Sequence, residues 1–401
     1  MNNKQSRRDF LVRSGQWIAS AGLLNKRGPS LWARPHPPRS EPNVITRALG
    51  KTGLTVPVVS LGFMNADNPG LIRRAYEVGV RHFDTAAAYQ RGRNEEMVGA
   101  MIQEMGVRSS VVVSTKVWLR DQVRDPKARD LFRQTFEDSL KRLRMDHVDI
   151  LYYHLVDSLE DLRAEGPLQA LAELKKEGKA RSIGFSTHRG GLVLPDAAKS
   201  GLFDVALVAF NFTMASDQIL LEALDNAARA GLGIVAMKTQ AGGLSQPDPK
   251  LPKNLPPHSQ TALLKWALHH PSVATAIPGA TTYEQVDQNF TVASNLEYTD
   301  DEKSFLADRT FSVQAQFCRQ CAQCLGDCPR GADIPTLMRS HMYAVQYSNR
   351  ELARFTLSSM GTGRGLDVCR SCRECRVMCR HDVNIGMKIA HLKTAELGLA
   401  V

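Results

Sequence analysis

Cysteine is missing from most of this chain. The first 317 of its 401 residues contain none, and all 8 cysteines fall in the remaining C-terminal part. Cysteines that only filled core volume would be spread along the sequence. The distribution therefore excludes a mere packing role and indicates a dedicated site near the C-terminus.

Long apolar runs are missing as well. No stretch approaches the roughly 18 consecutive apolar residues of a membrane-spanning helix, so we expect a soluble mature protein with no transmembrane span. Lys and Arg outnumber Asp and Glu by 51 to 41, but no basic stripe is interleaved with aromatic side chains. The net charge of +10 therefore does not predict nucleic-acid binding.

The N-terminus carries a candidate export signal. Residues 6–11 are Ser-Arg-Arg-Asp-Phe-Leu, and a short, mildly apolar run follows at 16–24. This pattern resembles a twin-arginine signal, which predicts a signal over 1–34, a Pro-rich linker over 35–44 and a periplasmic or otherwise exported protein. The alternative is a basic amphipathic or disordered tail. The sequence does not identify a cleavage site.

The cysteines form two copies of one spacing. They follow the pattern Cys-x-x-Cys-x-x-Cys-x-x-x-Cys, at Cys318, Cys321, Cys324 and Cys328 and again at Cys369, Cys372, Cys375 and Cys379. Bacterial ferredoxins use this spacing to bind 4Fe-4S clusters. Zinc needs only paired Cys-x-x-Cys units, and disulfides need no equal spacing, so both remain less favoured alternatives.

In two-cluster ferredoxins the fourth cysteine of each motif ligates the other cluster. That rule predicts two 4Fe-4S clusters within residues 301–401. One would be bound by Cys318, Cys321, Cys324 and Cys379, and the other by Cys369, Cys372, Cys375 and Cys328. We expect mostly helix over 334–360, between the motifs, which resembles the helical ferredoxin subunits of respiratory enzymes. Cys379 precedes Arg380 rather than the proline that follows Cys328.

Upstream of the cysteines, short β-branched runs alternate with amphipathic helical segments. The expected strands are 58–61, 81–85, 111–115, 148–153, 181–185, 205–210, 233–237 and 273–277. Repeated βα units of this number and length predict an α/β fold, a TIM (β/α)8 barrel over 45–300, followed by a smaller, mainly helical ferredoxin-like domain. An open doubly wound sheet is the rival fold, but no Gly-x-Gly-x-x-Gly turn follows the first strand.

Polar residues stand where the second, third and fourth expected strands end, which is where barrels of this type place their chemistry. The segments are Asp-Thr-Ala-Ala-Ala-Tyr at 84–89, Ser-Thr-Lys at 114–116 and Asp-Ile-Leu-Tyr-Tyr-His at 149–154. With Leu-Gly-Lys-Thr-Gly-Leu at 49–54 and Ile-Pro-Gly-Ala at 277–280, they resemble the aldo/keto reductase family over about 45–300.

The resemblance implies a catalytic tetrad for carbonyl reduction. Tyr89 would donate a proton to the developing alkoxide, and Lys116 would lower the pKa of Tyr89. Asp84 would pair with Lys116, and His154 would hydrogen-bond the substrate oxygen. For any one of these residues a structural ion pair or a satisfied core histidine is the ordinary alternative; together and in family order they favour catalysis.

The resemblance weakens where family members hold the nicotinamide ring. Ser186 is kept, but Thr187 replaces an Asn and Leu207 replaces a Gln, while Phe210 could still stack on the ring. Because a Leu side chain forms no hydrogen bond, one amide contact is lost.

The adenine end departs as well. Gly279, Ala280 and Gln285 stand where NADPH-specific relatives place a Lys, a Ser and an Arg, and only Asn289 is retained. The sequence therefore does not predict a preference for NADPH: the pocket would take NADH, bind a nucleotide weakly or hold another molecule, and the electrons could then come from another source.

Three functions fit these patterns. The leading hypothesis is an exported oxidoreductase of the aldo/keto reductase family that acts on a small carbonyl or alcohol and passes electrons through two 4Fe-4S clusters to or from a redox partner protein. The second is a nucleotide-dependent reductase with structural or sensing clusters. The third is a non-enzymatic electron-transfer subunit that keeps the barrel as a scaffold. Hydride carries two electrons and a cluster passes one, and no flavin motif is visible to join them.

Overall fold

The computed structural model describes residues 43–241, 256–308 and 317–394. The expected export signal, and the linker up to residue 42, lie outside the described residues.

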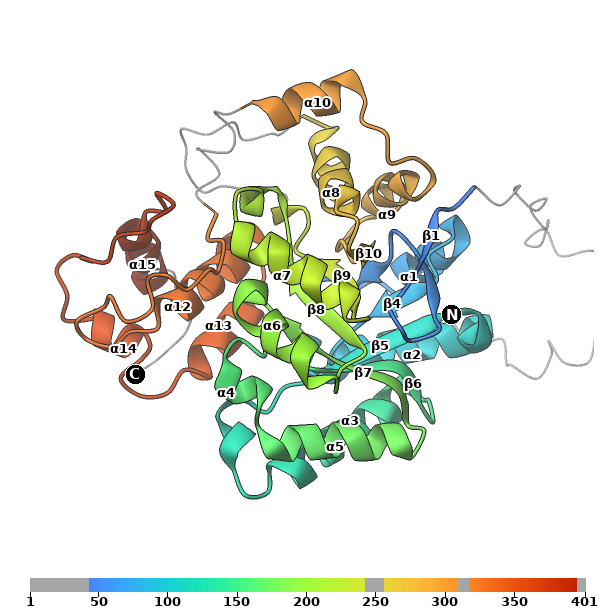
Figure 1. Ribbon diagram of the computed structural model, residues 1–401, viewed down its shortest axis with the longest axis horizontal. Helices are drawn as coiled ribbons and strands as arrows, with labels where there is room; N and C mark the ends of the chain where they lie inside the picture. Colours follow the sequence, from blue (N-terminus) through green and yellow to red (C-terminus); the bar gives the residue numbers. More distant parts are fainter. Residues whose placement is uncertain (1–42, 242–255, 309–316, 395–401) are drawn as a thin grey trace, which may run out of the picture. The chain divides into compact units, whose positions relative to one another are not determined.

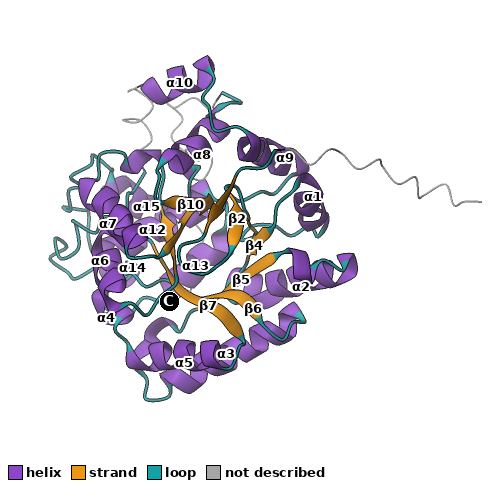
Figure 2. Cartoon of the chain, turned by 45° about the vertical axis from the view of Figure 1, so that its right-hand side comes forward, coloured by secondary structure: helices purple, strands orange, loops and turns teal. Residues whose placement is uncertain are grey.

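Eight parallel strands form the centre of the N-terminal part, and helices surround them (Figure 2). The strands are β3 (Leu61–Gly62), β4 (His82–Asp84), β5 (Val112–Val117), β6 (Val148–Tyr153), β7 (Ala180–Thr187), β8 (Val205–Ala209), β9 (Gly233–Met237) and β10 (Val273–Ala276). Each pairs with its sequence neighbour. This arrangement confirms the expected TIM barrel, in which each βα unit places the next strand beside the last.

The barrel closes through single bridges rather than a full strand pair. Val59 pairs with Ala276 and Gly62 with Gly279, both in parallel, so the first and last strands meet. The first strand is therefore shorter than the expected 58–61, because only Leu61 and Gly62 pair with β4.

A hairpin that the sequence did not predict precedes the barrel. Strands β1 (Thr46–Ala48) and β2 (Thr55–Pro57) pair in antiparallel orientation. Gly50 in the connecting turn has a φ of +53°, and a Cβ there would lie 2.2 Å from the backbone nitrogen of Gly233, the first residue of β9. The hairpin therefore covers the end of the barrel where the strands begin, opposite the strand ends that carry the polar residues.

Amphipathic helices connect the strands (Figure 1). They are α1 (Gly70–Val78), α2 (Arg93–Met105), α3 (Ala128–Leu143), α4 (Leu159–Leu162), α5 (Glu165–Lys176), α6 (Gly190–Ser200), α7 (Gln218–Arg229), α8 (Ser259–His269) and α9 (Tyr283–Thr291). Their apolar faces and both faces of the strands form one continuous hydrophobic core.

The C-terminal part is helical, as expected. It contains α10 (Asp300–Ala307), α12 (Ile334–His341), α13 (Arg350–Ser358), α14 (Leu366–Cys369) and α15 (Ile385–Thr394), with a π-helical turn at Met342–Gln346. Its hydrophobic core also includes Ala241, Ala262 and Leu263 from the barrel segment. No helix within the described residues has the length and apolar character needed to cross a membrane.

Candidate active site and cluster site

A buried ion pair joins two strand ends. Asp84 is the last residue of β4, Lys116 lies near the end of β5, and each is only 1 % exposed. The Lys116 ammonium pairs with Asp84 Oδ1 and donates to the carbonyl of Thr85 at 2.6 Å, while Ser114 Oγ donates to Asp84 Oδ2 at 2.7 Å. The expected orientation of Lys116 by Asp84 is therefore present in the geometry.

Tyr89 lies beside this pair. Its hydroxyl is 3.4 Å from Lys116 Nζ, and the ammonium lies 4.8 Å from the centre of the Tyr89 ring. The 3.4 Å separation is at the long end of a hydrogen bond.

The pKa of Tyr89 moves in the direction opposite to the expected one. Burial and the negative charge of Asp84 raise the pKa of Tyr89 well above its usual value. The Lys116 ammonium does not offset them, because burial lowers the pKa of Lys116 while the pKa of Tyr89 is raised. Tyr89 is therefore fully protonated at neutral pH and carries the proton that a general acid needs.

His154 follows β6 and packs edge-on against Tyr89, with ring centroids 6.1 Å apart. Burial, and then the charge of Lys116, lower the pKa of His154 well below its usual value, so its ring is neutral. Its Nδ1 is buried and has no hydrogen-bond partner among the described residues. A neutral imidazole in this place can hydrogen-bond a substrate oxygen without exchanging a proton.

A cavity of about 550 Å³ opens beside the tetrad. Asp84 and Tyr89 line this cavity together with the segment after β10. Residues 346–348, which come from the cluster domain, contribute a further part of the wall. The volume is in the range of small-molecule and cofactor sites.

The residues expected to hold a nucleotide divide into two groups. Gly279, Gln285 and Asn289 line this cavity, and Asn289 Oδ1 accepts a hydrogen bond of 2.6 Å from Gln240. Ser186 and Phe210 do not line it.

Ser186 and Phe210 instead make contacts in the protein interior, away from the cavity. Ser186 Oγ accepts a 3.0 Å hydrogen bond from the amide of Leu155, next to His154. Phe210 packs outside the strands, with its ring centroid 4.9 Å from Trp266 of α8. Its ring is 1 % exposed and offers no free face for stacking.

Sequence reasoning missed other residues that line the cavity. Met237 and Lys238 lie where β9 ends, and residues 346–348 are the last residue of the π-helical turn and the two residues after it. Lys238 ends an expected strand, as Lys116 does, so the same argument could have found it. Residues 346–348 give no such signal, because their place depends on long-range packing.

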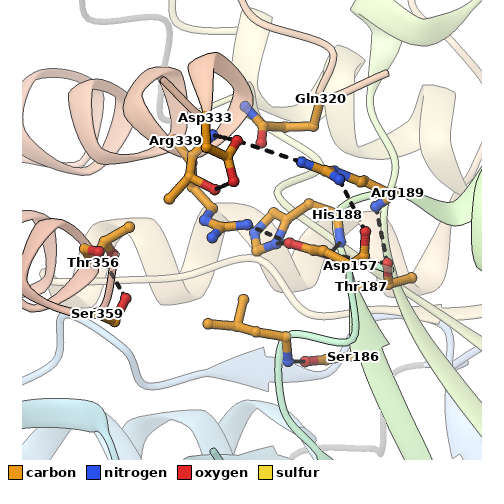
Figure 3. A network of polar contacts seen from close by, with 12 residues as sticks. Asp157, Ser186, Thr187, His188, Arg189, Gln320, Asp333, Arg339, Thr356 and Ser359 are labelled. Carbon is orange, nitrogen blue, oxygen red and sulfur yellow. Dashed lines mark hydrogen bonds and ion pairs between the residues drawn. The ribbon is translucent and has the colours of Figure 1, made fainter. Parts of the chain in front are cut away.

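A buried polar network joins the barrel to the cluster domain (Figure 3). Asp157, after β6, pairs with Arg339 of α12, and its Oδ1 accepts a 2.7 Å hydrogen bond from the amide of His188. Burial acts to raise the pKa of Asp157, but the charge of Arg339 and then the side chain of His188 outweigh it and hold the pKa well below its usual value. Arg189 extends the network to Asp333 at the start of α12, at 3.8 Å.

The cysteines lie in two groups that match the exchanged sets. Burial raises the pKa of Cys318 to about 12, and the neighbours that raise it further are Cys324, Cys321 and Cys379. Cys369 has Cys328, Cys372 and Cys375 as neighbours, and these four line a second cavity of about 690 Å³. Each group thus brings together three cysteines of one motif and the last cysteine of the other.

The donor set fits iron–sulfur clusters better than the alternatives. All 8 cysteines are free of disulfides. Within the part of the chain that is described, no three His, Cys, Asp or Glu side chains converge tightly enough for a single metal ion. A 4Fe-4S cluster is larger than a single metal ion, so the four cysteine thiols that would bind it lie farther apart than the ligands of one ion. Two hydrogen bonds reach cysteine sulfurs, from Gln320 to Cys318 at 3.2 Å and from the amide of His381 to Cys379 at 3.4 Å.

Comparison with known proteins identifies relatives of both the barrel and the cysteine-containing domain. The aldo/keto reductase family model matches residues 63–261, and a 4Fe-4S dicluster domain model matches residues 317–384. L-galactose dehydrogenase of Arabidopsis thaliana is 29 % identical over 63 % of this chain and 88 % of that protein. Methylglyoxal reductase DkgB of Escherichia coli O157:H7 is 28 % identical over 63 % of this chain and 93 % of that protein.

Solved structures give the same fold. An aldo-keto reductase of Bacillus halodurans superposes with a TM-score of 0.55 at 23 % identity, over 66 % of this chain and 95 % of that one. One from Pseudomonas aeruginosa gives a TM-score of 0.51 at 26 % identity, over 64 % and 98 %. The chain is therefore an oxidoreductase whose residues 63–261 are an aldo/keto reductase domain and whose residues 317–384 are a 4Fe-4S dicluster domain.

Proposed function

We propose that this protein interconverts a small carbonyl compound and the corresponding alcohol at Tyr89, and that two 4Fe-4S clusters carry the electrons. The observation that carries this proposal is the shared cavity. Asp84 and Tyr89 of the barrel and residues 346–348 of the cluster domain line the same space. A cluster domain that only stabilised the chain or sensed redox state would not need to wall the cavity that holds the proposed proton donor.

Each member of the tetrad has a role in this proposal. Tyr89 donates its proton to the oxygen of the substrate as charge develops there. Lys116, fixed by Asp84, places a positive charge 3.4 Å from the Tyr89 hydroxyl and stabilises the phenolate that remains. The neutral His154 orients the substrate oxygen by a hydrogen bond.

The electron count sets a further requirement. Reduction of a carbonyl consumes two electrons and two protons, one of them from Tyr89 and one delivered to carbon with the electron pair. Bound clusters supply the electrons one at a time, so the cavity must also hold a two-electron carrier, either a nicotinamide or a flavin. Gly279, Gln285 and Asn289 line the cavity and offer this carrier a place.

The named relatives support the substrate class. L-galactose dehydrogenase and methylglyoxal reductase both act at a carbon that carries a hydroxyl or carbonyl oxygen. The relatives therefore favour a small aldehyde, ketone or sugar for this chain.

A nucleotide-dependent reductase with structural or sensing clusters is the second candidate. It is favoured by the three nucleotide-side residues in the cavity and opposed by the positions of Ser186, Phe210 and Leu207, all of which are buried outside it.

One experiment separates the candidates. Anaerobically purified protein with its clusters reduced by dithionite, and with excess reductant removed, is supplied with a substoichiometric amount of a nicotinamide nucleotide or a flavin as the two-electron carrier. It is then mixed with methylglyoxal and other small carbonyls while cluster absorbance is followed. We expect reoxidation of the clusters with formation of alcohol, slowed about 10²-fold or more by Tyr89→Phe. Tyr76→Phe, which removes a hydroxyl that contacts Ser110 far from the cavity, is the matched control.

Reoxidation by Tyr89→Phe at the wild-type rate would contradict the role of the tetrad. Alcohol formation that requires NADH or NADPH, without any change in the clusters, would establish the second candidate instead.

The proposal includes export and a redox partner. The Arg-Arg pair at positions 7 and 8 supports the twin-arginine route, which carries folded proteins and so allows cluster insertion in the cytoplasm. Replacement of both arginines by lysine should retain the protein in the cytoplasmic fraction.

Exposed Arg370, Arg373 and Arg376 near the second cysteine motif favour an acidic redox partner, whose binding should weaken as salt rises.

A further inference from the structure

Gln320 is a buried residue that donates to the sulfur of a cluster ligand. It lies between Cys318 and Cys321 of the first motif and is 2 % exposed. Its Nε2 donates a hydrogen bond of 3.2 Å to the sulfur of Cys318, and its backbone amide donates to the same sulfur. Side chain and backbone of one residue thus both direct N–H groups at one sulfur.

The conformation of Gln320 is unfavourable in two respects. Its φ is +57°, in the left-handed region that residues other than glycine rarely adopt. Its Oε1 is buried without a hydrogen-bond partner among the described residues. The opposite orientation of the amide would point this oxygen at the sulfur, and a cluster-bound thiolate accepts hydrogen bonds but repels an oxygen. The arrangement therefore suits a charged sulfur at Cys318.

Lys388 places a buried cation beside the same sulfur. It lies on α15 and is 4 % exposed. The negative charge that attracts its ammonium is that of Cys318, and no carboxylate pairs with it in the described part of the chain. A buried cation without a counter-charge is strongly unfavourable. Lys388 is therefore a second, independent sign that negative charge is held at Cys318.

The second group of cysteines lacks both features. This group, here the Cys369 group, consists of Cys369, Cys372, Cys375 and Cys328, and the first, the Cys318 group, of Cys318, Cys321, Cys324 and Cys379. As far as the chain is described, no N–H group donates to a sulfur of the Cys369 group. Its neighbouring cations, Arg373, Arg376 and Lys393, are exposed, so water and salt screen their charges.

The Cys318 group also lies against the barrel. Arg319, next to Cys318, donates a hydrogen bond of 3.0 Å to Ser216 in the loop before α7. Phe317 belongs to the hydrophobic core that includes Ala262 and Leu263 of the barrel segment. The described residues that line the cavity of the Cys369 group, in contrast, all come from the cluster domain.

We propose that Gln320 and Lys388 raise the reduction potential of the cluster bound by the Cys318 group, so that electrons from the redox partner collect on the barrel side of the domain. A cluster gains one negative charge with each electron it takes up. N–H donors and nearby cations stabilise that charge, and burial opposes it. Gln320 and Lys388 offset the burial. The inference rests on the two clusters of the proposed function but not on carbonyl reduction.

The test is a redox titration of the anaerobic, cluster-loaded protein, followed by electron paramagnetic resonance, which gives a midpoint potential for each cluster. We expect Gln320→Leu to lower one reduction equilibrium constant about tenfold, which is about 59 mV for a one-electron couple, and to leave the other unchanged. Lys388→Met should lower the same potential. The shifted signal should be the one that Cys318→Ser removes.

Two control variants separate this effect from general disturbance of the domain. Gln323→Leu removes an exposed amide of the same motif that bonds no sulfur among the residues described, and neither potential should change. Lys393→Met removes the exposed cation beside Cys369. It should lower only the other potential, and by less than Lys388→Met, because the charge of Lys393 is screened.

An unchanged potential in Gln320→Leu, equal shifts of both potentials, or a shift confined to the signal that Cys369→Ser removes would overturn the proposal. If the variants do not bind clusters, wild-type protein decides. With isotope-labelled nitrogen in the glutamine side chains, pulsed electron paramagnetic resonance should detect a coupling to this nitrogen on the signal of the Cys318 group. Absence of that coupling overturns the proposal. Because no carbonyl is turned over, failure of carbonyl reduction would leave these results unaffected.

Discussion

Tyr89 keeps its proton because burial and the charge of Asp84 act in the same direction on its pKa. The sequence predicted that Lys116 would dominate, since an ammonium near a phenol lowers its pKa. That prediction already paired Lys116 with Asp84, but it left out the burial of Tyr89 and the effect of the Asp84 charge on the phenol. Both raise the pKa of Tyr89, and burial lowers the pKa of Lys116 itself.

His82 is a buried histidine whose lowered pKa should make the stability of the protein depend on pH. It is fully buried between Ser60 and Ser114, and burial lowers its pKa from 6.5 to about 4. Below pH 6.5 the unfolded chain binds a proton that the folded chain refuses, so folding becomes less favourable as pH falls toward 4.

We expect the lowered pKa of His82 to decrease the free energy of unfolding by about 2 kcal/mol between pH 7 and pH 5. Anaerobic urea unfolding of wild type and His82→Gln at both values measures it. The variant should be less stable at pH 7 but lose less on acidification. An equal loss in both proteins would show that His82 is not responsible.

At the scale of elements, the strands could be predicted because short β-branched runs alternate regularly with helices. The β1–β2 hairpin was missed because each of its strands has only 3 residues. Phe210 was misplaced for a different reason. All residues of β8 are buried, so the sequence does not show which side chains face the barrel interior and which face the helices.

A buried ion pair joins α12 to the loop after β6, between Arg339 and Asp157. Arg339 is 6 % exposed and Asp157 8 %. Removal of the arginine leaves a buried carboxylate without its main counter-charge, which costs much more than loss of an exposed pair.

Arg339→Met should therefore destabilise the protein by roughly 3–5 kcal/mol, and the double variant Arg339→Met with Asp157→Asn should recover part of that loss. Arg364→Met, which removes an exposed partner of Asp333 at 3.8 Å, should cost no more than about 1 kcal/mol. Denaturant unfolding measures all three. A similar cost for both single variants would show that burial of the pair is not decisive.

At the scale of the whole molecule, the repeated cysteine spacing predicted a cluster domain, and the family match confirms one. The exchange of the last cysteine between motifs stays a prediction, supported by the two groups of neighbours. Residues 346–348 could not be assigned to the cavity from sequence, because more than 250 positions separate them from Tyr89 and only the folded chain brings them there.

If the last cysteine of each motif binds the other cluster, replacing single cysteines should remove the two cluster signals in a specific pattern. Cys379→Ser and Cys318→Ser should remove the same electron paramagnetic resonance signal, and Cys328→Ser should remove the signal that Cys369→Ser removes. Iron content should fall from about eight to about four per chain in each variant. Loss of one signal by both Cys318→Ser and Cys328→Ser would show instead that each motif binds its own cluster.

The wall formed by residues 346–348 also bears on how such chains can be recombined. Along the sequence the two family segments follow one another and look like separable modules. In space, the second completes the cavity of the first and shares its hydrophobic core with Ala241, Ala262 and Leu263. Grafting this cluster domain onto another barrel, or exchanging it for a different one, would therefore also move or replace part of the wall of the barrel's own cavity.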